Sequence, residues 1–176
     1  GVDGSMPNEN IGGTAAWATA YQRASEAVAA LARQVPPLSQ MGATAASLVV
    51  HPQTIVVSNI GDARVYRLWR GYFTQLSEDD RSFDGSTVTQ ALGPHLRGVP
   101  DPHLLELPLT EPLRMLLCTD GLWDVASEAS VEGIVREESA VDRAVRALVD
   151  AALCAGGRDN ITVVLADLVP EPGDGM

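Results

Sequence analysis

The sequence contains few cysteines, which excludes one common way of stabilising a small domain. Only Cys118 and Cys154 occur among its 176 residues, and two are too few for a disulfide framework. Each lies in an apolar context, Cys118 in an expected strand and Cys154 in an expected helix, so we expect both thiols to be buried and reduced. At about 100–200 residues per domain, the length predicts a single domain over residues 1–176.

Basic residues are also scarce. The sequence has 12 Lys and Arg against 23 Asp and Glu, for a formal net charge of −11, and the pI is about 4.5. All basic residues are arginine, which we interpret as compositional bias. An acidic chain repels both the phosphates of nucleic acid and an anionic membrane surface. We therefore expect neither of them as a partner.

Long apolar runs are absent as well. No run approaches the ~20 residues that a membrane-spanning helix requires, and the sequence shows no signal peptide. These features predict a cytoplasmic protein.

The pattern of apolar residues predicts an α+β chain, in which a helix is followed by a run of strands, two helices and a last strand. Helical spacing predicts helices over 12–34, 130–138 and 141–155, and a short helix over 88–92. Alternation and β-branched residues predict strands over 45–50, 54–58, 63–69, 73–76, 103–109, 115–119 and 161–168. Residues 1–11 are irregular and include a Gly-Ser-Met typical of a cloning scar, and 170–176 form a tail.

Three aspartates lie at strand ends, where carboxylates commonly hold a hard cation. Asp120 follows the apolar run that ends at Cys118, and Asp159 precedes the last predicted strand. If these two strands are antiparallel neighbours, both carboxylates meet at one sheet edge. Asp62, at the start of another strand, is a third candidate. Like charges at one edge call for a cation, and oxygen ligands favour Mg²⁺ or Mn²⁺; three unrelated turn aspartates are the alternative.

Six short motifs occur in order between residues 41 and 168. They are Met41-Gly-Ala-Thr44, Asn59-Ile-Gly-Asp-Ala-Arg-Val-Tyr-Arg67, Gln75-Leu-Ser-Glu-Asp-Asp80, Thr89-Gln-Ala-Leu-Gly93, Cys118-Thr-Asp-Gly-Leu-Trp-Asp124 and Gly157-Arg-Asp-Asn-Ile-Thr-Val163. In these motifs the chain resembles the metal-dependent protein serine/threonine phosphatases of the 2C type. One position departs from the family pattern, because Asp80 stands where the family usually has histidine.

The resemblance implies a two-layer antiparallel β-sandwich flanked by helices, with metal ions at one edge. Asp120 and Asp159 would be ligands of a two-metal centre, and Asp62 with Asp120 would match an additional, weaker site of bacterial members. The implied reaction is hydrolysis of phosphoserine and phosphothreonine in a phosphoprotein, with two or three Mg²⁺ or Mn²⁺ ions as cofactors. Two such ions about 4 Å apart activate a water and clamp the phosphate. Arg158, beside Asp159, is expected to steer the anionic substrate.

The amino-terminal part departs from the family. Family members begin with strands that carry a phosphate-gripping arginine and end in Asp-Gly-x-Gly-Gly, whereas only eleven residues precede the first predicted helix here. One interpretation makes Asp3-Gly4 the remnant of that strand end, with Asp3 as the bridging metal ligand. In the other, Ile11-Gly12-Gly13 matches the glycines and the aspartate is lost. The flap segment is also shortened.

Three hypotheses follow for the function. The first is an active, metal-dependent phosphatase domain. The second is a phosphatase-like binding or regulatory module that keeps the fold and has lost the chemistry. The third is a domain completed by another chain or by an upstream segment, because shortening at the amino terminus predicts an exposed sheet edge that a dimer or such a segment would cover.

Overall fold

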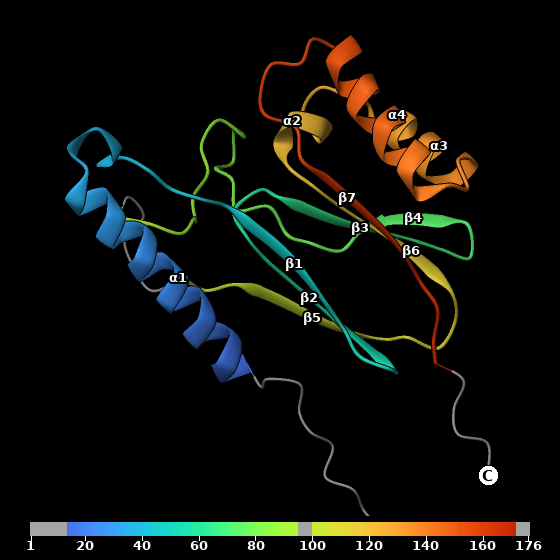
Figure 1. The fold of residues 1–176 in the computed structure, drawn as a ribbon, viewed down its shortest axis with the longest axis horizontal. Coiled ribbons are helices and arrows are strands. Elements are labelled where there is room, and N and C mark those ends of the chain that lie inside the picture. The colour runs from blue at the N-terminus through green and yellow to red at the C-terminus, as the bar shows by residue number, and fades with distance from the viewer. Residues whose placement is uncertain (1–13, 95–99, 172–176) are drawn as a thin grey trace, which may run out of the picture.

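The strands form two antiparallel sheets stacked face to face, with helices on both outer faces (Figure 1). The structure is a computed structural model, and it describes residues 14–94 and 100–171. The three-stranded sheet has the order β1 (Ala45–Val50), β2 (Thr54–Ile60), β5 (His103–Pro108). The four-stranded sheet has the order β4 (Tyr72–Gln75), β3 (Arg64–Trp69), β6 (Leu113–Cys118), β7 (Val163–Leu168). This is the two-layer antiparallel sandwich that the family resemblance implies.

Helices cover the two outer faces of the sandwich. The amino-terminal helix α1 (Thr14–Gln34) and the 3₁₀ turn η1 (Pro36–Leu38) lie on the side of the three-stranded sheet. On the four-stranded sheet lie α2 (Asp120–Trp123), α3 (Glu128–Glu137) and α4 (Val141–Cys154). Figure 1 shows α1 and the α3–α4 pair on opposite sides of the strands.

Alternation along the strands divides the core into three apolar layers, because successive side chains of a strand point to opposite faces. Ile55 of β2 packs with Met115 of β6 between the two sheets. Ile60, at the end of β2, instead packs with Tyr21 of α1. On the outer face of the other sheet, Leu116 of β6 packs beneath α2, α3 and α4. Each sheet is thus buried on both faces.

The helix predicted over 141–155 is present and buries one apolar face, but the burial predicted for Cys154 is wrong. Ala144, Leu148 and Ala152 of α4 are fully buried. Cys154 is exposed, since it lies two residues past Ala152 and a step of about 200° turns it to the opposite face of the helix. Cys118 is buried as predicted, and desolvation raises the pKa of its thiol to about 12. The thiol therefore stays protonated and cannot serve as a nucleophile.

The short helix predicted over 88–92 is also wrong. This segment instead forms two isolated bridges, Val88 with Arg81 and Leu92 with Ala43. The Leu92 and Ala43 N–H groups donate to each other's carbonyl groups at 2.8 and 2.9 Å. A run of five residues is too short to hold a helix on its own, so pairing with a distant segment determines its conformation. The other predicted strands and long helices agree with the structure to within two residues at each described end.

No helix in residues 14–94 or 100–171 combines the length and the apolar character needed to cross a membrane.

Replacing Tyr21 by phenylalanine tests how α1 is fastened to the sheet. The Tyr21 hydroxyl is 2.8 Å from Ser58 Oγ, and Ser58 Oγ is 2.6 Å from Ser47 Oγ. We expect Tyr21→Phe to lower the free energy of unfolding by about 1 kcal/mol, because a buried hydrogen bond is lost. Urea denaturation followed by circular dichroism measures the change.

Tyr72→Phe is the matched control, because the Tyr72 side chain is 73% exposed. This substitution is expected to leave the unfolding midpoint unchanged. Equal midpoints for the Tyr21→Phe variant and the parent protein would contradict the role given to the buried hydroxyl group.

Candidate metal centre

The pairing of β6 with β7 brings Asp120 and Asp159 to one edge of the sandwich. Beyond the last strand pair the ladder continues through Thr119, whose N–H donates to the Thr162 carbonyl at 3.1 Å. The Thr119 hydroxyl donates to the Asn160 carbonyl at 3.2 Å. Asp120 directly follows Thr119, and Asp159 directly precedes Asn160, so the two aspartates are the next residues outward on the two segments. The convergence of these two aspartates that antiparallel pairing predicts is therefore present.

A close backbone contact holds this edge together. A Cβ atom placed on Gly121 would lie 2.2 Å from the Asn160 carbonyl oxygen, so only glycine fits here. The contact sets the first turn of α2, which begins at Asp120. In the facing segment, the Asn160 N–H donates to Asp159 Oδ1 at 2.6 Å. Each carboxylate is thus contacted by the backbone N–H of the residue that follows it, Gly121 for Asp120 and Asn160 for Asp159.

The surroundings of Asp120 disfavour its negative charge. Desolvation raises the pKa of the Asp120 carboxyl, and the negative charges of Asp62 and Asp159 raise it further. The Gly121 N–H and the Arg81 guanidinium act in the opposite direction but do not reverse the shift. A cation bound beside Asp120 and Asp159 would relieve this repulsion.

Asp62 reaches the same edge through a tight turn between the two sheets. Gly61, which joins β2 to the turn, has φ of +88°, and a Cβ on it would lie 2.3 Å from the Thr44 Cγ2 atom. Asp80 holds the turn, because the Gly61 N–H donates to Asp80 Oδ2 at 2.7 Å and the Asp80 N–H donates to the Gly61 carbonyl at 2.9 Å. His103 Nε2 lies 2.9 Å from the other carboxylate oxygen of Asp80. The aspartate in the family's histidine position therefore stabilises the turn.

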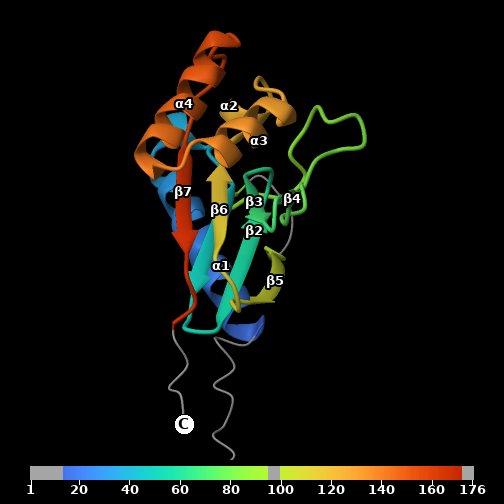
Figure 2. The same ribbon diagram turned by 90° about the vertical axis from the view of Figure 1, so that its right-hand side faces the viewer.

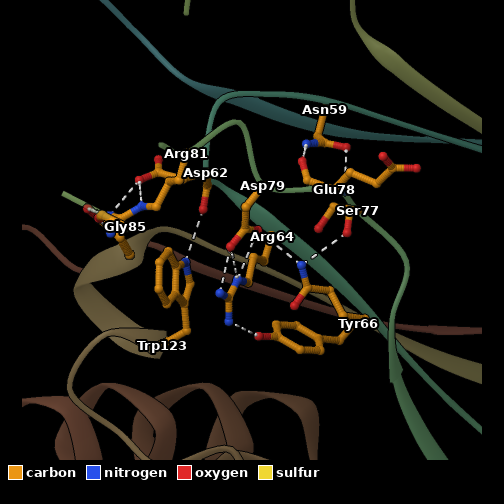
Figure 3. Close-up of polar contacts among 12 residues, drawn as sticks. Asn59, Asp62, Arg64, Tyr66, Ser77, Glu78, Asp79, Arg81, Gly85 and Trp123 are labelled. Carbon is orange, nitrogen blue, oxygen red and sulfur yellow. Dashed lines mark hydrogen bonds and ion pairs between the residues drawn. The ribbon is translucent and has the colours of Figure 1, made fainter. Parts of the chain in front are cut away.

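Arg81 is a residue of this edge that the sequence analysis does not single out. Its Nε and Nη2 atoms lie 2.9 and 2.7 Å from Asp62 Oδ2 (Figure 3), and Nη2 lies 3.5 Å from Asp120 Oδ2. The signal available in the sequence is a basic residue directly after the motif that ends at Asp80. Its contacts join positions 19 and 39 residues apart in the chain, which no local pattern reveals.

Trp123 lies between the acidic edge and the helices. Its indole N–H donates to the Asp62 carbonyl at 3.0 Å (Figure 3). The guanidinium carbons of Arg64 and Arg81 lie 3.6 and 4.8 Å from its ring centroid, within cation–π range. Arg64 also pairs with Asp79 at 2.6 Å. Both arginines are thus held by aromatic and carboxylate partners.

The remaining candidates of the sequence analysis are only partly placed. Arg158 is exposed and directly precedes Asp159, whereas Asp3 and Gly4 lie outside the described residues. In the described part of the chain, no group of three or more His, Cys, Asp or Glu side chains is arranged to hold a metal ion. Asp120 and Asp159 offer the oxygen donors that a hard cation prefers. They supply part of a coordination shell, and waters or residues outside the described ranges would have to complete it.

Comparisons with known proteins agree with the fold and the motifs. The family model for protein phosphatase 2C matches residues 4–155. The serine/threonine protein phosphatase PstP of Mycobacterium tuberculosis is 31% identical over 165 residues, which cover 85% of this chain and 32% of PstP. The serine/threonine phosphatase stp of Listeria innocua is 26% identical, over 83% of this chain and 64% of that protein. The chain thus spans about a third of PstP.

Solved structures share the architecture. The crystal structure of the PstP catalytic domain in complex with two manganese ions superposes with a TM-score of 0.79 at 29% identity, covering 94% of this chain and 74% of that one. The phosphatase Stp1 of Staphylococcus aureus also has a TM-score of 0.79, over 95% of this chain and 71% of that one. At 18% identity, this second likeness concerns the fold alone.

Alanine at position 121 tests the close contact beneath the acidic edge. Gly121→Ala would push a methyl group into the Asn160 carbonyl, and overpacking of this kind costs about 1–3 kcal/mol. We expect a loss of stability in that range, measured by chemical denaturation.

Gly133→Ala, inside α3, is the control, because a Cβ placed there has no atom within 4 Å. Alanine favours a helix by about 1 kcal/mol over glycine, so this variant should be as stable as the parent or more so. A Gly121→Ala variant of undiminished stability would show that the two segments are not packed as described.

Proposed function

Because the chain belongs to the protein phosphatase 2C family, we propose that it hydrolyses phosphoserine and phosphothreonine in proteins with Mg²⁺ or Mn²⁺ held at Asp120 and Asp159. The observation that carries this proposal is the pairing of β6 with β7, which brings the segments of Asp120 and Asp159 to one edge, where the charge of Asp159 acts on Asp120. The homology to PstP and its manganese-bound catalytic domain supports it. The chain spans about a third of PstP, so the activity and the substrates belong to the proposal.

The residues at this edge suit such a reaction. Mg²⁺ or Mn²⁺, when bound, acidifies water and polarises the phosphoryl oxygens. Asp120 and Asp159 supply negatively charged oxygen ligands, and the Thr119 ladder fixes the distance between the two segments. Rigid support of this kind keeps ligands in the geometry that a metal requires. Arg158, exposed beside Asp159, attracts an anionic phosphoprotein to a rim that is otherwise acidic.

Asp3 is proposed as a further metal ligand, with its neighbour Gly4 in the turn. The proposal rests on the match between Val2-Asp3-Gly4 and the strand end that carries the family's bridging aspartate. The substitution Asp3→Ala separates the two interpretations of the amino terminus. If Asp3 bridges the ions, the variant loses its metal-stimulated rate, whereas an unchanged rate removes Asp3 from the site.

The partner at the sheet edge is a separate part of the proposal. β7 is the last strand of the four-stranded sheet, and no strand in residues 14–94 or 100–171 pairs with its outer edge. Val164 on this strand is 53% exposed. Either a second copy of the chain or an upstream segment would cover this edge. Sedimentation velocity at rising concentration separates them, because only a second copy makes the mass rise above 18.6 kDa.

Neutralising either carboxylate should weaken both metal binding and catalysis. We expect Asp120→Asn and Asp159→Asn each to lower Mn²⁺ affinity at least about tenfold, since even outer-shell partners of a metal are worth about 10–100-fold. Calorimetry measures the affinity, and Mn²⁺-dependent hydrolysis of p-nitrophenyl phosphate measures the activity. Asp150→Asn, on the exposed side of α4, changes charge equally and should alter neither.

Two results would argue against this function. Unchanged Mn²⁺ affinity in both the Asp120→Asn and Asp159→Asn variants would remove the metal site from this edge. If the Mn²⁺-stimulated rate of the parent protein is no higher than that of Asp120→Asn, the protein has the fold but not the activity. A binding or regulatory module would then be the better hypothesis.

A further inference from the structure

Arg81 lies between two of the three strand-end aspartates, Asp62 and Asp120, that the sequence analysis assigns to metal ions. Its Nε and Nη2 atoms contact Asp62 Oδ2 at 2.9 and 2.7 Å, and Nη2 also lies 3.5 Å from Asp120 Oδ2. The Nη1 group donates to the Gly85 carbonyl at 2.9 Å (Figure 3). All three nitrogens of the guanidinium therefore have acceptors, and two of these acceptors are carboxylates.

We infer that Arg81 is a built-in cation that takes the place of a divalent ion between Asp62 and Asp120. In this assignment Asp62 binds arginine and not metal. The inference rests on the proposed function only in taking Asp120 and Asp159 as the carboxylates that hold diffusible ions. The number of ions that the protein binds then depends on the residue at position 81.

Burial explains why Asp62 requires a permanent partner. Its side chain is 5% exposed, and a buried carboxylate without a positive partner is strongly destabilising. An ion bound to Asp62 Oδ2 at a ligand distance of about 2.1–2.5 Å would lie within about 5 Å of Arg81 Nη2. The ion and the guanidinium would then repel each other while competing for one oxygen atom. In this assignment the arginine holds that oxygen atom, through its Nε and Nη2 contacts with Asp62 Oδ2.

The segment that carries Arg81 is fastened to the sandwich just before that residue. Asp80 and Gly61 exchange hydrogen bonds of 2.7 and 2.9 Å across the turn between the sheets. The amide of Asn59, which is buried, donates to the Glu78 carbonyl at 2.6 Å. Figure 2 shows the chain after β4 continuing into a loop at the end of the molecule where α2 lies. Arg81 thus enters the acidic edge from a fixed base, and not as a free surface side chain.

Arg81 compensates the three carboxylates unequally. Asp62 receives two contacts below 3 Å and Asp120 receives one at 3.5 Å. Among the residues that the structure describes, the guanidinium forms no ion pair with Asp159. The uncompensated charge lies on the side of Asp120 and Asp159. Diffusible ions are therefore drawn to that side and not towards Asp62.

Removing the positive charge at position 81 should create a cation site. We expect Arg81→Gln to bind one more Mn²⁺ ion than the parent protein at saturation, counted by electron paramagnetic resonance of the unbound ion. The added site should disappear in the double variant Arg81→Gln/Asp62→Asn. Adding Mn²⁺ should also raise the thermal midpoint of Arg81→Gln more than that of the parent, because an ion then compensates the buried Asp62.

Arg64→Gln is the matched control. Arg64 also stacks on Trp123 and pairs with a carboxylate, Asp79, but the structure gives it no contact with Asp62 or Asp120. This variant should bind as many Mn²⁺ ions as the parent. An Arg81→Gln variant that gains no ion would overturn the inference, as would an equal gain in Arg64→Gln.

Asp62→Asn in the parent background provides a test that does not require Arg81→Gln to fold. The asparagine side chain still accepts a hydrogen bond from Arg81, and the count of bound Mn²⁺ ions should not change. Loss of an ion in this variant would show that Asp62 holds metal beside Arg81, and the inference would fail. The proposed function fails on a different result, namely unchanged Mn²⁺ affinity in both Asp120→Asn and Asp159→Asn.

Discussion

The pairing of β6 with β7 is the interaction on which the acidic edge depends. It aligns two segments that lie about forty residues apart, so that the residue after one strand and a residue before the other become neighbours. The ladder of Thr119 and the contact of Gly121 with Asn160 carry this alignment beyond the strands themselves. Backbone hydrogen bonds between the two segments support the aspartates that they carry, which is the preorganisation that a metal site needs.

The second constraint is the turn between the two sheets. β2 belongs to one sheet and β3 to the other, so the chain crosses the sandwich at Gly61 and presents Asp62 at the same end as Asp120. Asp80 fastens this crossing from outside, and its carboxylate also contacts His103 of β5. The edge is therefore assembled from both sheets, and its geometry depends on how they stack. The apolar layer around Ile55 and Met115 holds the two sheets together, and it therefore sets the positions of the acidic residues indirectly.

The elements that sequence analysis predicts well are those that local patterns encode. Alternation identifies β1 and β7, helical spacing identifies α4, and the assumption that two apolar strands are neighbours places Asp120 near Asp159. The errors arise where distant contacts decide the outcome. Residues 88–92 are not helical because Val88 pairs with Arg81 and Leu92 pairs with Ala43. The partners of Arg81 lie 19 and 39 residues away, so its place beside the motif that ends at Asp80 does not reveal them.

A positive charge on a side chain is always present, whereas a bound ion is present only in proportion to its concentration in solution. The occupancy of an ion site follows the free concentration of the ion and vanishes in the presence of a chelator. The guanidinium of Arg81 is covalently attached, so its effective concentration beside Asp62 does not depend on the medium. Charge compensation at this end of the edge is therefore constant under metal starvation and metal excess alike. The charge around Asp62 therefore does not change with the concentration of metal ions. Only ion binding at Asp120 and Asp159 responds to that concentration.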